Sequence, residues 1–200
     1  MGLITDLWDT TVTYQGRGYR TRAAYDTVLA VQKLYRDEKL SDPDKVSQAL
    51  RMLLCSPCRV SYLAMEKRFG LLEEIFNQQI KTDNGRQASS GKPRVVDFEL
   101  DGEYIYAAFL QDYGIDLIEQ QGKLHWKKFL ALFQGLSDDT RIKQIMQIRG
   151  MDLPKPNKHN QDQIQKILEL KSYYALPVRG GGGRSGLNSL FDTLERMAGQ

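Results

Sequence analysis

The sequence predicts a mainly α-helical protein with a short β-hairpin near its N-terminus, and three patterns support this prediction. Along most of the chain, apolar residues recur every three or four positions, which is the period of an amphipathic helix. Over residues 11–22 they alternate instead around Gly16 and Gly18, and glycines supply the positive backbone angles of a tight three-residue hairpin turn. A glycine-rich run at 179–186 separates a last amphipathic segment from the rest. We therefore expect a single helical domain over residues 1–178, about six to seven helices in all, and a flexibly tethered C-terminal helix.

The first three expected helices span residues 23–39, 41–55 and 61–80. Ser41 is a suitable N-cap for the second helix, with Asp44 three residues further on. Gly70 lowers the helix propensity in the middle of the third. The apolar positions of the first and third helices recur at helical spacing and are Val28, Val31, Leu34, Tyr35, Leu63, Phe69, Leu72, Ile75 and Phe76.

Residues 82–93, with the sequence TDNGRQASSGKP, interrupt the helical pattern. The segment has almost no side chain suited to burial and several turn-forming residues, so apolar burial does not offset the entropy lost on ordering it. We expect a mobile loop inserted within one domain, because the helices on either side each need a partner face.

Two aromatic-rich helices follow, at 101–114 and 124–134. Asp101 can cap the first of them, Leu100 can pack onto Ile105 as a hydrophobic staple, and Gly114 can close it in the left-handed conformation. The residues expected to face the core are Tyr106, Phe109, Leu110 and Tyr113 in the first helix and Trp126, Phe129, Leu130 and Phe133 in the second.

The last two helices of the domain are expected from Ser137 or Asp138 to Gly150, and from Asn160 or Gln161 to the residue before Pro177. A proline-punctuated loop connects them. Their apolar positions are Ile142, Ile145 and Met146 in the first and Ile164, Ile167, Leu168 and Tyr174 in the second.

Composition favours a soluble protein of the cytoplasm. The chain has 200 residues, 41% apolar and 26% charged, and no apolar run approaches the length that spans a bilayer. The net charge of +3 can be traced to residues 81–94, where four basic residues accompany one acidic residue. Nucleic-acid binding is therefore not favoured, because it needs basic residues focused on one face of an ordered element.

Four features suggest chemistry, and each has a simpler explanation. Cys55 and Cys58 have dithiol spacing, but Cys55 lies at the end of a helix, where the dipole disfavours a thiolate; we expect ordinary buried or half-buried thiols. His125 lacks an assignable partner for acid–base catalysis and is expected to be packed or hydrogen-bonded. The alternating carboxylates from Asp97 to Glu103 suit helix capping and solvation. The run at 179–186 lacks the Gly-Lys-Ser/Thr of a phosphate loop and is interpreted as a flexible linker. We therefore expect no enzyme activity, no cofactor and no metal site.

The segment over residues 187–200 is the candidate partner-binding site. A helix this short is marginal in water. Burial of four large apolar side chains would contribute about 8 kcal/mol, whereas ordering a dozen residues costs about 12 to 24 kcal/mol. We therefore expect this amphipathic tail to fold only when docked, either on its own domain or in a groove of another protein. The apolar stripe that would make the contact consists of Leu187, Leu190, Phe191, Leu194 and Met197.

Several sequence blocks resemble one known family. In order, they are VTYQGRGYRT, VDFELDGEYIYAAFLQDYGIDL, LHWKKFLALFQGL, IMQIRGMDL and YYALP. Together they resemble the bacteriophage gene-product-fifteen family of tailed phages and prophages of Gram-positive bacteria, over about residues 9–177, and most specifically over 96–153. The polar loop, the cysteine pair and the glycine linker depart from the resemblance.

The resemblance implies a protein of the tail-morphogenesis module. It implies a tail assembly chaperone that binds the tape-measure protein and other tail components in the host bacterial cytoplasm, without enzyme activity, cofactor or catalytic residues. The alternative is a minor structural or connector component of the virion, with an association with nucleic acid left open. Self-association is also left open, and no membrane association is expected.

Overall fold

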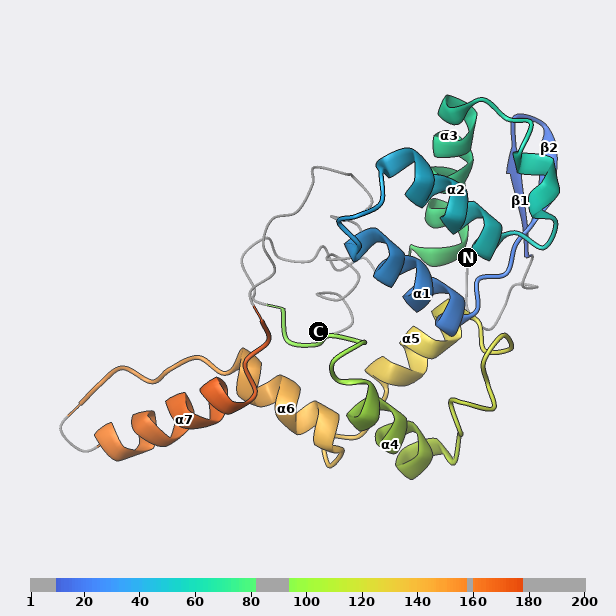
Figure 1. Cartoon of the computed structure of the whole chain (residues 1–200). Coiled ribbons are helices and arrows are strands. Elements are labelled where there is room, and N and C mark those ends of the chain that lie inside the picture. The colour runs from blue at the N-terminus through green and yellow to red at the C-terminus, as the bar shows by residue number, and fades with distance from the viewer. Residues whose placement is uncertain (1–9, 82–93, 158–159, 178–200) are drawn as a thin grey trace.

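The computed structural model describes residues 10–81, 94–157 and 160–177, and it is mainly helical, as predicted (Figure 1). The predicted loop at 82–93, the linker at 179–186 and the tail at 187–200 lie outside these residues. In chain order, the elements of the described part are β1 (Thr11–Tyr14), β2 (Arg17–Arg20), α1 (Tyr25–Arg36), α2 (Asp42–Leu53), the 3-10 helix η1 (Pro57–Val60), α3 (Met65–Ile75), the π-helical turn η2 (Phe76–Ile80), α4 (Gly102–Tyr113), α5 (Trp126–Gln134), α6 (Arg141–Gly150) and α7 (Gln161–Tyr173).

The hairpin forms as an antiparallel pair, but its turn differs from the expected one. Tyr14 pairs directly with Arg17, so the turn has two central residues, Gln15 and Gly16, with φ of 49° and 75°. The expected three-residue turn centred on Arg17 is therefore wrong. A two-residue turn with positive φ at both positions matches the right-handed twist of the strands, and the hairpin adopts it although one position is not glycine.

The hairpin packs on α3 at the glycine that weakens that helix. A Cβ atom added at Gly70 would collide with the hydroxyl of Tyr14. The absence of a Cβ atom at Gly70, which lowers helix propensity, thus allows β1 to approach α3 closely.

Only part of the third expected helix, at 61–80, is α-helical. It begins at Met65, because the residues after Pro57 form η1 and a turn, and it changes to η2 after Ile75. The second helix begins as predicted, with the Ser41 side chain accepting from the backbone N–H of Asp44 at 3.4 Å. Among the predicted core positions of the third helix, Phe69 is 39% exposed, whereas Leu72, Ile75 and Phe76 are buried.

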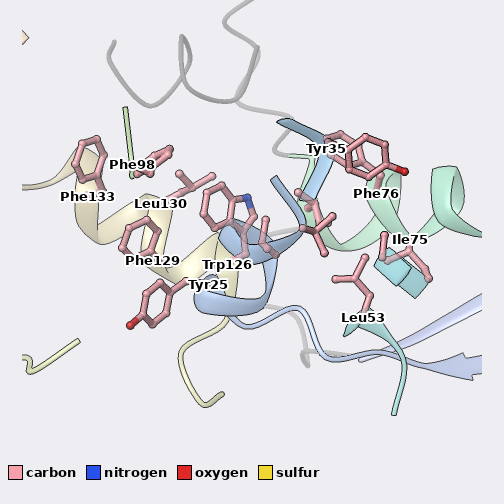
Figure 2. Close-up of a cluster of buried hydrophobic side chains, with 14 of the residues drawn as sticks. Tyr25, Tyr35, Leu53, Ile75, Phe76, Phe98, Trp126, Phe129, Leu130 and Phe133 are labelled. Carbon is pink, nitrogen blue, oxygen red and sulfur yellow. The ribbon is translucent and has the colours of Figure 1, made fainter. Parts of the chain in front are cut away.

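Phe129 of α5 lies at the centre of the aromatic core (Figure 2). Its ring stacks on Tyr25 at a centroid distance of 5.0 Å, on Phe109 at 5.2 Å and on Trp126 at 5.6 Å. Phe98, from the segment before α4, adds a tilted contact at 5.8 Å. All four predicted core residues of α5 are buried: Trp126, Phe129, Leu130 and Phe133.

The face that α4 buries overlaps the predicted one at Phe109 but is rotated away from Leu110. Its core residues are Ile105, Ala108 and Phe109, whereas Leu110 is 47% exposed. The two tyrosines of the predicted stripe, Tyr106 and Tyr113, are half-buried, and each hydroxyl has a polar partner. Tyr106 donates to the Asp116 carboxylate at 3.2 Å, and Tyr113 donates to the carbonyl of Leu132 at 2.9 Å.

The ends of α4 give one confirmed prediction and one correction. Gly114 has φ +64° and ends the helix in the left-handed conformation, and the N–H of Ile115 donates back to the carbonyl of Phe109. At the other end Leu100 is 56% exposed, so the expected hydrophobic staple to Ile105 does not form.

Candidate protein-interaction surface

α7 projects from the rest of the fold and buries none of its residues (Figure 1). Of the apolar positions expected in the last helix, Ile164, Ile167 and Tyr174 are half-buried, whereas Leu168 is 43% exposed. We call α7 together with residues 151–157, the segment that leads into it, the α7 arm. The exposed apolar residues of the arm are Met151, Leu153, Leu168, Leu170 and Tyr173.

A short helix without a buried face needs other contacts to stay formed. Lys171 supplies two of them, because its ammonium donates to the carbonyls of Arg149 at 2.8 Å and Met151 at 2.7 Å. The guanidinium of Arg141 donates to the Tyr174 hydroxyl, and it lies 5.6 Å from the centre of the same ring. Polar contacts at the C-terminal end of α7 therefore hold the arm to α6.

Arg149 is the centre of these contacts. Its Nε donates to the carbonyl of Tyr174 at 2.7 Å, and Nη1 donates to the carbonyl of Val95 at 3.0 Å. The two terminal nitrogens also bind the Asp101 carboxylate in a bidentate pair, at 2.6 and 2.8 Å. One side chain thus joins α6, the end of α7, the segment at 94–101 and the start of α4.

The Asp101 carboxylate does not cap α4 with its side chain, contrary to the sequence-based expectation. Asp97 and Asp101 are each only 2% exposed, so the expected solvation of both carboxylates is also wrong. Beyond Arg149, Asp101 accepts from the backbone N–H of Asp97 at 2.9 Å. Bidentate pairing and backbone donors offset the cost of removing this charge from water.

The Asp97 carboxylate lies between two arginines, at 3.3 Å from Arg94 and 3.6 Å from Arg36. Glu99, nearer the surface, pairs with Lys33 at 2.7 Å and with Arg36 at 3.0 Å. The hydrogen bond from Lys33 lowers the pKa of Glu99, and the charges of both cations act in the same direction. These ion pairs fix the 94–101 segment to α1, so the carboxylates of this stretch hold helices together.

His125 caps α5. Its Nδ1 accepts from the backbone N–H of Lys127 at 3.2 Å, which requires that nitrogen to be unprotonated, and its Nε2 faces the side-chain oxygen of Gln79 at 3.4 Å. Burial, together with the charges of Lys127 and Lys128, lowers the pKa of His125 to about 4. The imidazole is therefore neutral at physiological pH and hydrogen-bonded, as the sequence suggested.

Both cysteines are exposed, so the expected burial or half-burial of Cys55 and Cys58 is wrong. α2 buries its last apolar residues at Leu53 and Leu54, and the chain then turns outward before η1. The Cys55 thiol donates weakly to the carbonyl of Thr21 at 3.7 Å. Across residues 10–81, 94–157 and 160–177, no group of three or more His, Cys, Asp or Glu side chains is placed to hold a metal ion.

The five residues predicted to bind a partner fall outside the described part of the chain: Leu187, Leu190, Phe191, Leu194 and Met197. The exposed side of α7 was not predicted as a site, because an apolar stripe has the same spacing whether a helix meets a core or a partner. Among the described helices, none is long and apolar enough to cross a membrane.

The fold and this surface define a mainly helical protein with a projecting helical arm. The chain belongs to the Bacteriophage Gp15 protein family, whose sequence profile matches residues 4–176. It is thus a phage-related protein, and the resemblance and the fold class drawn from the sequence are confirmed. The match includes α7 and ends before the glycine-rich run. Comparison with curated proteins and with solved structures gives no match.

Proposed function

We propose that this protein is a non-enzymatic tail assembly chaperone that binds the tape-measure protein in the host bacterial cytoplasm during tail morphogenesis. Membership of a phage family supports a role in phage biology. The observation that carries the more specific proposal is the α7 arm, a helix with no buried residue and with Leu168, Leu170 and Tyr173 exposed.

A tape-measure protein is long and helical, and its apolar stripes need cover before the tail tube encloses them. A projecting helix with exposed apolar side chains can pack along such a stripe in the same way that amphipathic helices pack on each other. The aromatic ring of Tyr173, 80% exposed, offers a large contact area at small entropic cost.

The size of the apolar surface indicates a transient complex. Full burial of one large apolar side chain contributes about 1.5–3 kcal/mol, so covering the exposed parts of the five arm residues would contribute roughly 4–8 kcal/mol. Association itself costs an estimated 4–15 kcal/mol. The arm alone therefore supports weak, reversible binding, and further contacts are needed for a long-lived complex. Release is what a chaperone requires once the tail assembles.

The contacts of Arg149 favour this role, because they fix the orientation of the arm before any partner arrives. Its guanidinium joins the carbonyl of Tyr174 to the buried carboxylate of Asp101. A partner would then bind a preformed surface and would not have to order it, which lowers the entropic cost of binding.

Co-expression with the tape-measure protein tests the proposal. We expect the tape-measure protein to be soluble in the presence of this chain, to aggregate without it, and to co-purify with it. Equal solubility in both cases, with no complex isolated, would refute the chaperone role. Mass spectrometry of purified particles provides the second arm: a fixed, stoichiometric amount of this chain in the virion would favour a minor structural or connector component instead.

A further inference from the structure

α4 packs on α5 and α6 with one side and leaves a second apolar side open to solvent (Figure 1). On the open side, Tyr104 is 38% exposed and Leu110 is 47% exposed, and Ala107 between them is exposed as well. At 100° per residue these three positions fall within about 120° of the helix circumference, so they share one side. Leu100, one turn before Tyr104, is 56% exposed. We call these four residues the α4 face.

The α4 face is unusual for the outer side of a helix. A helix at the surface of a folded domain normally carries polar residues on its outer side, and a helix that is apolar all round is normally buried. The four residues of the face follow one another at intervals of four, three and three positions, over about three turns. An exposed apolar stripe with this spacing is the surface on which a partner helix packs.

The α4 face lies in an acidic stretch of the chain. Residues 95–122 contain seven acidic residues and no lysine or arginine. Glu103, on the open side of α4, and Glu119, in the turn that follows, are exposed and form no ion pair within the described part of the chain. Three others pair with cations from other segments: Asp97, Glu99 and Asp101.

The turn after α4 extends the face along one edge. Tyr106, one turn before Leu110, donates to the Asp116 carboxylate at 3.2 Å. The backbone N–H groups of Ile118 and Glu119 donate to the same carboxylate at 2.8 and 3.4 Å. Ile118 is 64% exposed, so this edge offers one more apolar side chain between carboxylates.

We propose that the α4 face binds an amphipathic helix of another protein, one that carries lysine or arginine along the edges of its apolar stripe. The apolar residues supply the contact area, and the carboxylates select the charge of the partner. A second copy of this chain is disfavoured as the occupant, because symmetric pairing of two α4 faces would place acidic residues opposite acidic residues. That the helix belongs to the tape-measure protein rests on the proposed function; the α4 face would then supply contacts beyond those of the arm.

Titration of the full chain with two fluorescent peptides tests the proposal. Each peptide is about 20 residues long, enough for a stable helix, and carries the same leucine stripe. One has lysine along the edges of the stripe and the other has glutamate. We expect the lysine peptide to bind at least tenfold more tightly at about 0.05 M salt, and the difference to narrow at about 0.5 M because salt screens exposed charges. Equal affinities at low salt, or no binding of either peptide, would overturn the proposal.

Two variants with matched controls locate the site. Glu103→Lys and its control Glu66→Lys each reverse an exposed glutamate in the first turn of a helix, so they change the net charge and the helix terminus alike. Leu110→Gln and its control Leu168→Gln replace leucines of similar exposure, 47% and 43%, the control lying on α7. We expect each of the two α4 variants to weaken the lysine peptide about three- to tenfold, and both controls to bind it like the parent chain.

The remaining outcomes contradict the α4 assignment in distinct ways. Equal weakening by Glu66→Lys would mean general charge attraction, and weakening by Leu168→Gln alone would place the peptide on the α7 arm. A dimer in sedimentation that Leu110→Gln dissociates would mean that a second copy covers the face. Co-purification of the tape-measure protein tests the proposed function separately: its success without peptide binding refutes only the α4 assignment, and peptide binding without a tape-measure complex refutes only the proposed function.

Discussion

Replacement of Arg149 by methionine is expected to destabilise the fold severely. The guanidinium side chain is 10% exposed and the Asp101 carboxylate 3%, with nitrogen–oxygen distances of 2.6 and 2.8 Å. Methionine fills much of the volume but leaves Asp101 as a buried charge without its cation, and it leaves the carbonyls of Val95 and Tyr174 without this donor. Removal of one partner of a buried pair costs about 3–5 kcal/mol.

Urea unfolding of the purified protein measures this cost. At a slope of about 2 kcal/mol per molar urea, the midpoint should fall by roughly 1.5–2.5 M. The double variant Asp101→Asn/Arg149→Met removes both charges, so it should be clearly more stable than the sum of the two single effects predicts. A loss of unfolding free energy below about 1 kcal/mol for Arg149→Met is the range of exposed ion pairs. It would show that water solvates Asp101, and it would refute a buried link between α4 and the α7 arm.

Three further predictions concern other parts of the fold. The folded protein keeps His125 neutral down to about pH 4, whereas the unfolded chain binds a proton near pH 6.5. The free energy of unfolding should therefore decline as the pH falls between these values, by about 2 kcal/mol after allowance for partial solvent exposure. His125→Asn, which keeps a capping side chain, should flatten this decline in denaturation curves measured from pH 7 to 4. Gly70→Ala should destabilise the protein by about 1–2 kcal/mol in thermal or urea unfolding through its collision with the Tyr14 hydroxyl. Combination with Tyr14→Phe should recover part of this loss, since two ring carbons stay within 3.1 and 3.3 Å of the added Cβ; an unchanged cost in the double variant would place the strain elsewhere. Both exposed thiols, Cys55 and Cys58, should react with a maleimide in the native protein, and protection of either until unfolding would contradict the observed exposure.

Local pattern determines how much of the fold could be predicted. α5 could be predicted almost completely, because its four apolar residues form one stripe with polar residues on the other side. In α4, two stripes overlap, one through Phe109 and the tyrosines and one through Ile105 and Ala108. The choice between them depends on hydroxyl partners elsewhere in the fold, including Asp116 and the carbonyl of Leu132, and spacing carries no information about these.

The candidate site could not be predicted for a related reason. The pair between Asp101 and Arg149 joins residues 48 positions apart, and nothing in the local sequence of either identifies the other. The apolar pattern predicted for α7 omits Leu170 and Tyr173, which lie off that pattern and are exposed. The predicted partner-binding residues in 187–200 stay a prediction, since they lie outside the described residues.

Co-purification with point variants of the α7 arm tests the central claim most directly. Leu170→Asp and Tyr173→Asp each place a charge at an exposed apolar position, and Ser172→Asp places the same charge at an exposed polar position of the same helical turn. We predict that each of the first two weakens binding of the tape-measure protein at least tenfold, equivalent to about 1.4 kcal/mol, while the Ser172 variant binds like the parent chain. Undiminished binding by both apolar-site variants, in proteins with unaltered stability, would contradict the assignment of α7 as the partner-binding surface.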